Sequence, residues 1–119
     1  MAPEMVFPVL GIIFVALAVP LATRRVPPNR WYGLRVPATF ADKTVWYDAN
    51  AATGRDIVRF GALATLIALV LPHVARVRTE IYVLICAVVF GLGSLILAVR
   101  GWRLANRLLR QRRGGGGAA

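Results

Sequence analysis

The sequence predicts an all-α membrane protein with three transmembrane helices, its N-terminus outside the cell and its C-terminus in the cytoplasm. Three observations predict this class: 58% of the 119 residues are hydrophobic, the apolar residues gather in three long runs, and most basic residues lie on one side of those runs. Soluble domains are roughly 45–50% apolar, and a domain this short has no interior large enough to hide the excess. The formal net charge of +10 therefore marks one face of a membrane, and no specific nucleic-acid partner is expected.

Each apolar run is long enough to cross a bilayer as a helix. Residues 5–23 and 81–99 contain no Asp, Glu, Lys or Arg, and each run gives about 28 Å of helix at about 1.5 Å per residue. The remaining span, 57–75, contains Arg59, whose long side chain reaches back to the lipid headgroups. A cleaved signal peptide is the alternative for the first run. Because no basic residue precedes that run, a retained span is favoured.

The basic residues set the orientation of the three spans. Of the 15 Lys and Arg residues, 13 lie in 24–59 or 100–113, and only Arg76 and Arg78 lie between the second and third spans. The positive-inside rule then places the first loop, 24–56, and the C-terminus in the cytoplasm. These counts predict a multi-pass membrane protein with a basic cytoplasmic side.

The second and third spans are predicted to pack as an antiparallel hairpin, because only a few residues connect them. Small residues on the third span, Ala87, Gly91, Gly93 and Ser94, allow a neighbouring helix to approach closely. Packing within the bundle is the simpler interpretation of these residues. A face that joins two copies of the chain is the alternative, so a homo-oligomer stays open.

The first half of the loop 24–56 is expected to be extended. Pro27 and Pro28 cannot continue a helix and favour extended backbone. Trp31 and Tyr32 follow, and an aromatic ring with a polar tip suits the membrane–water interface. The composition therefore places this part of the loop close to the headgroups.

The second half of the loop is predicted to form a helix. Thr39 and Asp42 have the spacing of an [ST]-x-x-[DE] capping box, so the helix is expected over about 40–53. Trp46 and Asn50 stand four residues apart and share one face of that helix.

The loop residues, taken in order, resemble a known family. The order Pro28-Asn29, Tyr32-Gly33-x-Arg35, Thr39, Trp46, Asn50 and Gly54-Arg55, between two membrane helices, is similar to the SdpI family of small bacterial membrane proteins. The resemblance covers the motif-bearing part, about Pro27 to Arg59, closely and the following two spans by layout, and it implies a place in the inner membrane of a bacterium. It implies a role in immunity to a secreted toxic peptide or in membrane-linked signalling, with a toxin peptide or a regulator protein as partner.

Two interpretations of the motif residues stay open. In the first, they lock the loop onto the bundle, with Arg35 and Arg55 paired to the loop's aspartates or to lipid phosphates. In the second, Arg35, Arg55 and Asn50 line a cytoplasmic pocket for an anionic headgroup, a peptide carboxylate or a partner protein. The candidate binding residues are Asn29, Tyr32, Gly33, Arg35, Thr39, Trp46, Asn50, Gly54 and Arg55.

No catalytic, cofactor or metal site is expected. His73 and Cys86 are the only residues of their kind and lie in different spans, and no acid or base stands at the centre of a span. The chain is therefore not expected to be an enzyme. The alternative to immunity or signalling is a small accessory subunit that stabilises a larger bacterial membrane complex.

The segment 100–113 is predicted to be a basic amphipathic helix. Its arginines repeat every three or four residues and form one face, and apolar residues form the other. This helix is expected to lie on anionic lipid through Arg100, Trp102, Arg103, Arg107 and Arg110. Residues 114–119, which are only Gly and Ala, predict a flexible tail.

Overall fold

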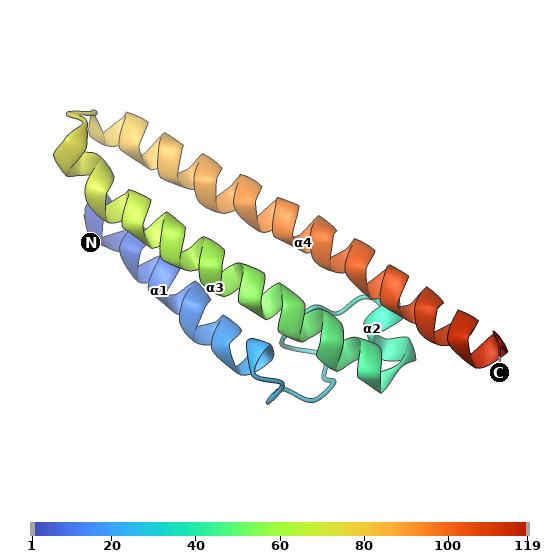
Figure 1. Ribbon diagram of the computed structural model, residues 1–119. Helices are drawn as coiled ribbons and strands as arrows, with labels where there is room; N and C mark the ends of the chain where they lie inside the picture. The colour runs from blue at the N-terminus through green and yellow to red at the C-terminus, as the bar shows by residue number, and fades with distance from the viewer. Residues whose placement is uncertain (1, 119) are drawn as a thin grey trace.

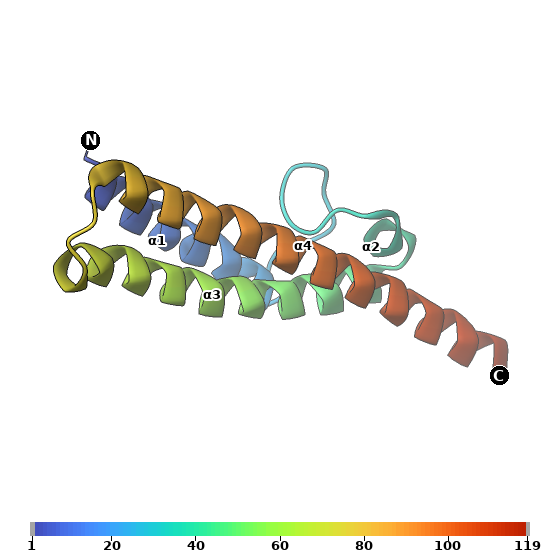
Figure 2. The ribbon, with the colours of Figure 1, turned by 90° about the horizontal axis from the view of Figure 1, so that it is seen from above.

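The computed structural model describes the backbone of residues 2–118 and the side chains as far as Gly114. The chain forms four helices in the order α1 (Pro3–Ala22), α2 (Pro37–Ala41), α3 (Lys43–Val74) and α4 (Thr79–Ala118). The three long helices lie side by side and give an elongated molecule of 61 × 21 × 20 Å (Figure 1, Figure 2). Each of the three is long and apolar enough to cross a membrane, as the predicted class of an all-α protein with three apolar helices requires.

Glycines allow α1 and α3 to pack closely. A Cβ atom added to Gly54 of α3 would lie 2.6 Å from the backbone nitrogen of Ala22 and 2.9 Å from the carbonyl oxygen of Ala18 in α1. A Cβ atom on Gly61, about two turns further along α3, would lie 2.8 Å from the side chain of Val15. The backbones of the two helices therefore meet at distances that only glycine permits.

The hairpin predicted for the second and third spans is formed by α3 and α4. The Tyr82 hydroxyl of α4 donates a hydrogen bond of 2.8 Å to the carbonyl oxygen of Ala68 in α3. Gly93 lies directly against the ring of Phe60, where a Cβ atom would clash, whereas Gly91 has nothing within 4 Å. Close packing by small residues is therefore confirmed for Gly93 within the bundle but does not extend to Gly91.

Aromatic rings join α1 to the other two long helices in the half of the bundle away from the first loop. The ring centroid of Phe90 in α4 lies 5.8 Å from that of Phe7, 5.6 Å from that of Phe14 and 6.2 Å from that of Phe60. Edge-on and tilted pairs at these separations are favourable contacts beyond the apolar area that they bury. This aromatic cluster is the main place where α1 touches α4.

The helix predicted over 40–53 and the span predicted over 57–75 are one continuous helix, α3. Arg55 and Asp56 mark the edge of the apolar run but do not end the helix. Charged side chains cost a helix little backbone stability, because long ones such as Arg are good helix formers. The first loop is therefore shorter than the predicted 24–56, and α3 projects beyond its apolar part by several turns.

The start of α3 also differs from the prediction. Its N-cap is Asp42, whose carboxylate accepts hydrogen bonds from the backbone N–H groups of Thr44 at 2.8 Å and Val45 at 3.3 Å. Thr39 lies inside the separate five-residue helix α2, which begins at Pro37. The predicted capping box is therefore wrong: Asp42 is the first residue of the cap and not its fourth, because a proline at the first position starts α2 earlier.

The predicted basic segment 100–113 continues α4 without a break. It keeps the axis of the third span, as the orange-to-red end of the ribbon shows (Figure 1), and packs beside the start of α3. Contact of its arginines with lipid headgroups stays a prediction. The helix runs on to Ala118, and beyond Gly114 the predicted flexible tail lies outside the described side chains.

Candidate functional site

The candidate site lies at the arginine-rich end of the bundle, where α1 ends and α3 begins. The segment between them, residues 23–42, is called the motif loop here. It leaves α1, bulges out beside α4 and returns through α2 to the start of α3 (Figure 2). Side chains of the sequence motif hold the backbone of this loop through hydrogen bonds.

Asn29 shapes the outer turn of the motif loop. Its side-chain oxygen accepts hydrogen bonds from the backbone N–H groups of Trp31 at 2.9 Å and Tyr32 at 2.7 Å, and its amide donates to the carbonyl oxygen of Pro27 at 2.8 Å. This is an Asx turn, in which a short polar side chain replaces a backbone partner. Asn29 is therefore a structural residue of the loop.

Asn50 fastens the motif loop to α3. Its side-chain oxygen accepts from the backbone N–H of Leu34 at 2.6 Å, and its amide donates to the carbonyl oxygens of Trp46 at 2.9 Å and Leu34 at 3.4 Å. The residue is only 2% exposed. Gly33 passes over it with φ = +110°, and a Cβ atom there would lie 2.9 Å from the Asn50 oxygen. Both the backbone angle and the close approach require glycine.

Trp46 and Thr39 complete this attachment. The indole N–H of the fully buried Trp46 donates to the carbonyl oxygen of Val26 at 2.9 Å. The Thr39 hydroxyl accepts from the backbone N–H of Val36 at 3.0 Å and faces the carbonyl oxygen of Leu34 at 3.0 Å. The loop anchor is the set Asn29, Gly33, Thr39, Trp46 and Asn50. Buried polar groups that are fully paired in this way fix one conformation of a segment.

Arg35 and Arg55 are exposed and do not meet at Asn50. Arg35 donates to the backbone carbonyl of Arg30 within the loop. Among the described side chains, neither Arg35 nor Arg55 forms an ion pair or lines either of the cavities described below. The structure therefore does not assemble the pocket expected from Arg35, Arg55 and Asn50. A role for the two arginines in binding stays a prediction.

Two aspartates of the predicted first loop, which lie in α3, pair with arginines other than Arg35 and Arg55. Asp48 lies 2.7 Å from Arg24, and Asp56 lies 3.8 Å from both Arg59 and Arg100. These pairs are partly exposed, so each contributes little to stability by itself. The charges of Asp48 and Asp56 are therefore balanced by neighbouring arginines of the protein itself.

The basic end of α4 packs against the motif loop and the start of α3. Ala38, Val45, Ala49 and Ala105 form a buried cluster, with Leu108 and Leu109 against it. Arg112 donates to the carboxylate of Asp42 at 2.7 Å, and this hydrogen bond holds the pKa of Asp42 below its ordinary value. The apolar face that was expected to enter lipid is thus largely covered by protein, while Trp102 stays exposed.

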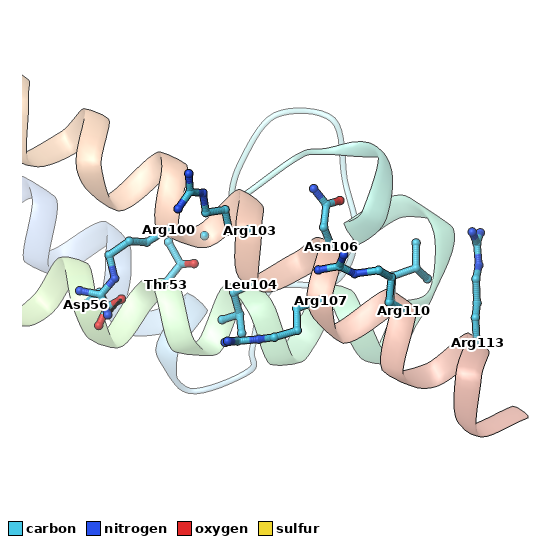
Figure 3. A pocket seen from close by; sticks show the side chains of 11 residues that line it. Thr53, Asp56, Arg100, Arg103, Leu104, Asn106, Arg107, Arg110 and Arg113 are labelled. Atoms are coloured by element: carbon cyan, nitrogen blue, oxygen red, sulfur yellow. Dashed lines mark ion pairs between the residues drawn. The ribbon is translucent and has the colours of Figure 1, made fainter. Parts of the chain in front are cut away.

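The opposite face of this part of α4 borders a groove of about 880 Å³ against α3. Arg100 reaches across it toward Asp56, and Thr53 of α3 lies between Arg100 and Arg103 in the view of Figure 3. The arginines that line this arginine groove are Arg100, Arg103, Arg107, Arg110 and Arg113. Four of the five predicted lipid-interface residues are therefore brought together at one surface.

A second, mostly apolar cavity of about 350 Å³ lies between α1 and α4, with α3 as its floor. Its apolar lining includes Phe14, Leu17, Ile57, Phe60, Leu97 and Ala98. Tyr32, Gly33 and Leu34 of the motif loop border it as well. This cavity, called the crevice below, and its residue Thr53 were not identified from the sequence, because they depend on how three distant segments meet.

The described side chains hold no group of three His, Cys, Asp or Glu residues placed to bind a metal ion. The polar chemistry of the site therefore rests on arginines, hydroxyls and backbone groups. This chemistry suits the recognition of anionic or carbonyl-bearing ligands.

Three membrane-spanning helices and a first loop fastened by buried polar side chains define the class: a small multi-pass membrane protein with a preformed loop. The chain belongs to the SdpI/YfhL protein family, whose model matches residues 25–100, more than half of the chain. The match includes nearly all of the motif loop, α3 and the apolar part of α4, so the resemblance, close in the loop and by layout over the two following spans, is confirmed. Neither curated proteins nor solved structures give a match.

Proposed function

We propose that this protein acts at the bacterial inner membrane in immunity to a secreted toxic peptide or in membrane-linked signalling, through the outer surface of its motif loop. The observation that carries the proposal is the contrast within that loop. The anchor side chains of Thr39, Trp46 and Asn50 are buried and paired with backbone groups. Trp31, in contrast, is 87% exposed and stands beside the exposed Arg30. Exposed tryptophan and arginine are residue types that dominate binding surfaces.

The rigidity of the loop supports the same proposal. A segment that must be ordered on binding loses affinity, because its conformational entropy is removed at that moment. Here Asn29 and Asn50 hold the loop backbone before any partner arrives. The positive-inside rule places this end in the cytoplasm. Its arginines favour a partner with acidic side chains or a free carboxylate.

The experiment compares surface and anchor variants in cells challenged with the secreted peptides of neighbouring bacteria. Arg35→Ala changes an exposed side chain, and Asn50→Ala removes the anchor. Both are expected to abolish protection while membrane insertion is retained. Arg78→Ala, an exposed arginine of the α3–α4 connection, is the matched control and should protect fully.

Full protection by both Arg35→Ala and Asn50→Ala would reject the loop as the functional surface. Mass spectrometry after gentle detergent extraction tests the alternative class. A regulator bound through the motif loop should be lost with Arg35→Ala. A larger membrane complex that is retained at fixed stoichiometry in both variants would instead identify an accessory subunit.

A further inference from the structure

The crevice between α1 and α4 is apolar at one end and polar at the other. Phe14 and Phe60, which belong to the aromatic cluster around Phe90, line its apolar end. Its other end is bordered by the motif loop, where Tyr32 and Gly33 lie. The crevice is therefore an apolar slot within the span region that ends at the level of the loop.

Two residues that border the crevice, Tyr32 and Thr53, carry buried hydroxyl groups that have no partner within the described chain. Within the described part of the chain, the Tyr32 hydroxyl and the Thr53 hydroxyl are both buried, and neither forms a hydrogen bond. Thr53 is only 7% exposed. Burial raises the pKa of Tyr32, so its phenol stays a proton donor at neutral pH. An unpaired buried hydroxyl is costly, and two at one cavity indicate that a ligand's acceptor atoms complete them.

Thr53 also borders the arginine groove, so the two cavities meet at this residue. Gly101 of α4 packs closely against Thr53 at this point, because a Cβ atom there would lie 2.8 Å from the Thr53 hydroxyl oxygen. From the crevice outward, the surroundings thus change from apolar side chains to hydroxyl donors and then to guanidinium groups. That order matches an acyl chain, an ester and a phosphate.

We propose that the crevice and the arginine groove together bind one anionic phospholipid from the leaflet at the arginine-rich end. One acyl chain fills the crevice, the ester oxygens accept hydrogen bonds from Thr53 and Tyr32, and the phosphate contacts the arginines of the groove. This lipid would act as a fixed part of the bundle, joining α1 to α4 where the protein itself leaves them apart. The site does not depend on the proposed function, because its residues and its ligand differ from those of the loop surface.

The test is a lipid titration of the detergent-solubilised protein followed by native mass spectrometry. Phosphatidylglycerol is expected to add one molecule with an affinity at least about tenfold above later additions and above phosphatidylcholine of the same chain length, since a charge-assisted contact of about 1.5 kcal/mol gives that ratio. Soluble glycerol phosphate, which has the headgroup chemistry without a chain, should not compete.

Thr53→Val tests the hydroxyl at the junction. The variant removes a group that has no partner in the described chain, so the protein should fold normally and the first lipid should bind about fivefold to tenfold more weakly. Thr65→Val is the matched control on the same helix, since the Thr65 hydroxyl is already bonded to the carbonyl oxygen of Gly61. The control should leave the lipid affinity unchanged.

Ala98→Trp tests the slot by filling it from α4, and Ala87→Trp on the same helix is its control, because Ala87 is exposed and does not line the crevice. Ala98→Trp should remove the tightly bound lipid, and Ala87→Trp should keep it.

The double variant Arg103→Gln with Arg107→Gln tests the phosphate contact. Its control is Arg76→Gln with Arg78→Gln, in the α3–α4 connection at the opposite end of the bundle. Lipids that bind equally to all of these variants, in several weak and equivalent steps, would overturn the proposal and identify an ordinary lipid annulus only.

Discussion

Two sets of buried polar side chains lie at the same end of this bundle and differ in one respect. The side chains of Asn50, Trp46 and Thr39 are paired with backbone groups of the motif loop and of α3. The hydroxyls of Tyr32 in the motif loop and Thr53 in α3 have no partner within the described chain. The paired set explains how the loop holds its shape, and the unpaired set indicates where a ligand completes the protein.

The largest effect is expected when the paired set is broken at Asn50. Asn50→Leu leaves the backbone N–H of Leu34 without its acceptor and removes the amide that also donates to the Leu34 carbonyl oxygen, which costs about 2–3 kcal/mol. Denaturant unfolding in mixed micelles should show this loss, and trypsin should cut faster at Arg30 and Arg35. Asn106→Leu on α4 is the control, because no hydrogen bond of its side chain is described, and its stability should change by less than about 0.5 kcal/mol.

The next largest effect is expected at Gly54, the family motif residue on the α1 side of α3. Gly54→Ala places a methyl group against the backbone of Ala22 and Ala18, and overpacking of this kind costs about 1–3 kcal/mol. Gly91→Ala is the matched control, since it meets open space. If Gly54→Ala is as stable as Gly91→Ala in the same micelles, the close crossing of α1 and α3 is wrong.

A smaller effect is expected at Asp42, which caps α3 and pairs with Arg112. Because its folded pKa lies below its ordinary value, its contribution is present at neutral pH, above the unfolded pKa of about 4, and is lost as the pH falls through the folded value. Asp42→Asn keeps a capping side chain and should lose only the charge-dependent part, whereas Asp42→Ala should lose both. Thermal unfolding followed between neutral and acidic pH separates the charge-dependent contribution of Asp42 from its capping contribution. Equal losses of stability in Asp42→Asn and Asp42→Ala would show that capping by Asp42 does not stabilise α3.

The smallest effect on stability is expected for the unpaired set. Tyr32→Phe removes a hydroxyl that has no partner in the described chain. Because an unpaired buried hydroxyl is costly, the free energy of unfolding without added lipid should not fall and should rise by up to about 1 kcal/mol. A loss comparable to that of Asn50→Leu would show that the hydroxyl is paired within the protein, and the contrast between the two sets would fail.

Much of the fold follows from the sequence because hydropathy and charge act over long stretches. The three spans and the hairpin of α3 and α4 were predicted from apolar runs and from the short connection between residues 75 and 80. The helix ends were harder to predict, because hydropathy reports where the membrane ends and not where the helix ends. Arg55 therefore stands inside a helix whose predicted elements ended on either side of it.

The candidate site was predicted only in part, for a different physical reason. Trp46 and Asn50 were placed on one helix face, which is where they hold the loop. Their partners are backbone groups of Val26 and Leu34, 20 and 16 residues away, and no local pattern specifies such contacts. No sequence pattern identified Thr53 as a candidate site residue. Its role depends on a hydroxyl without a partner in the described chain and on its place beside two cavities, which only the folded structure shows.

Hydrogen exchange in the motif loop tests most directly whether the motif residues hold that loop in one shape. The backbone N–H groups of Leu34 and Val36 donate to the side chains of Asn50 and Thr39, so both should exchange slowly in the native protein and quickly in Asn50→Ala. The N–H of Arg35 between them, for which no acceptor is described, should exchange quickly in both proteins. Exchange at Leu34 and Val36 as fast as at Arg35 in the native protein would contradict a preformed loop.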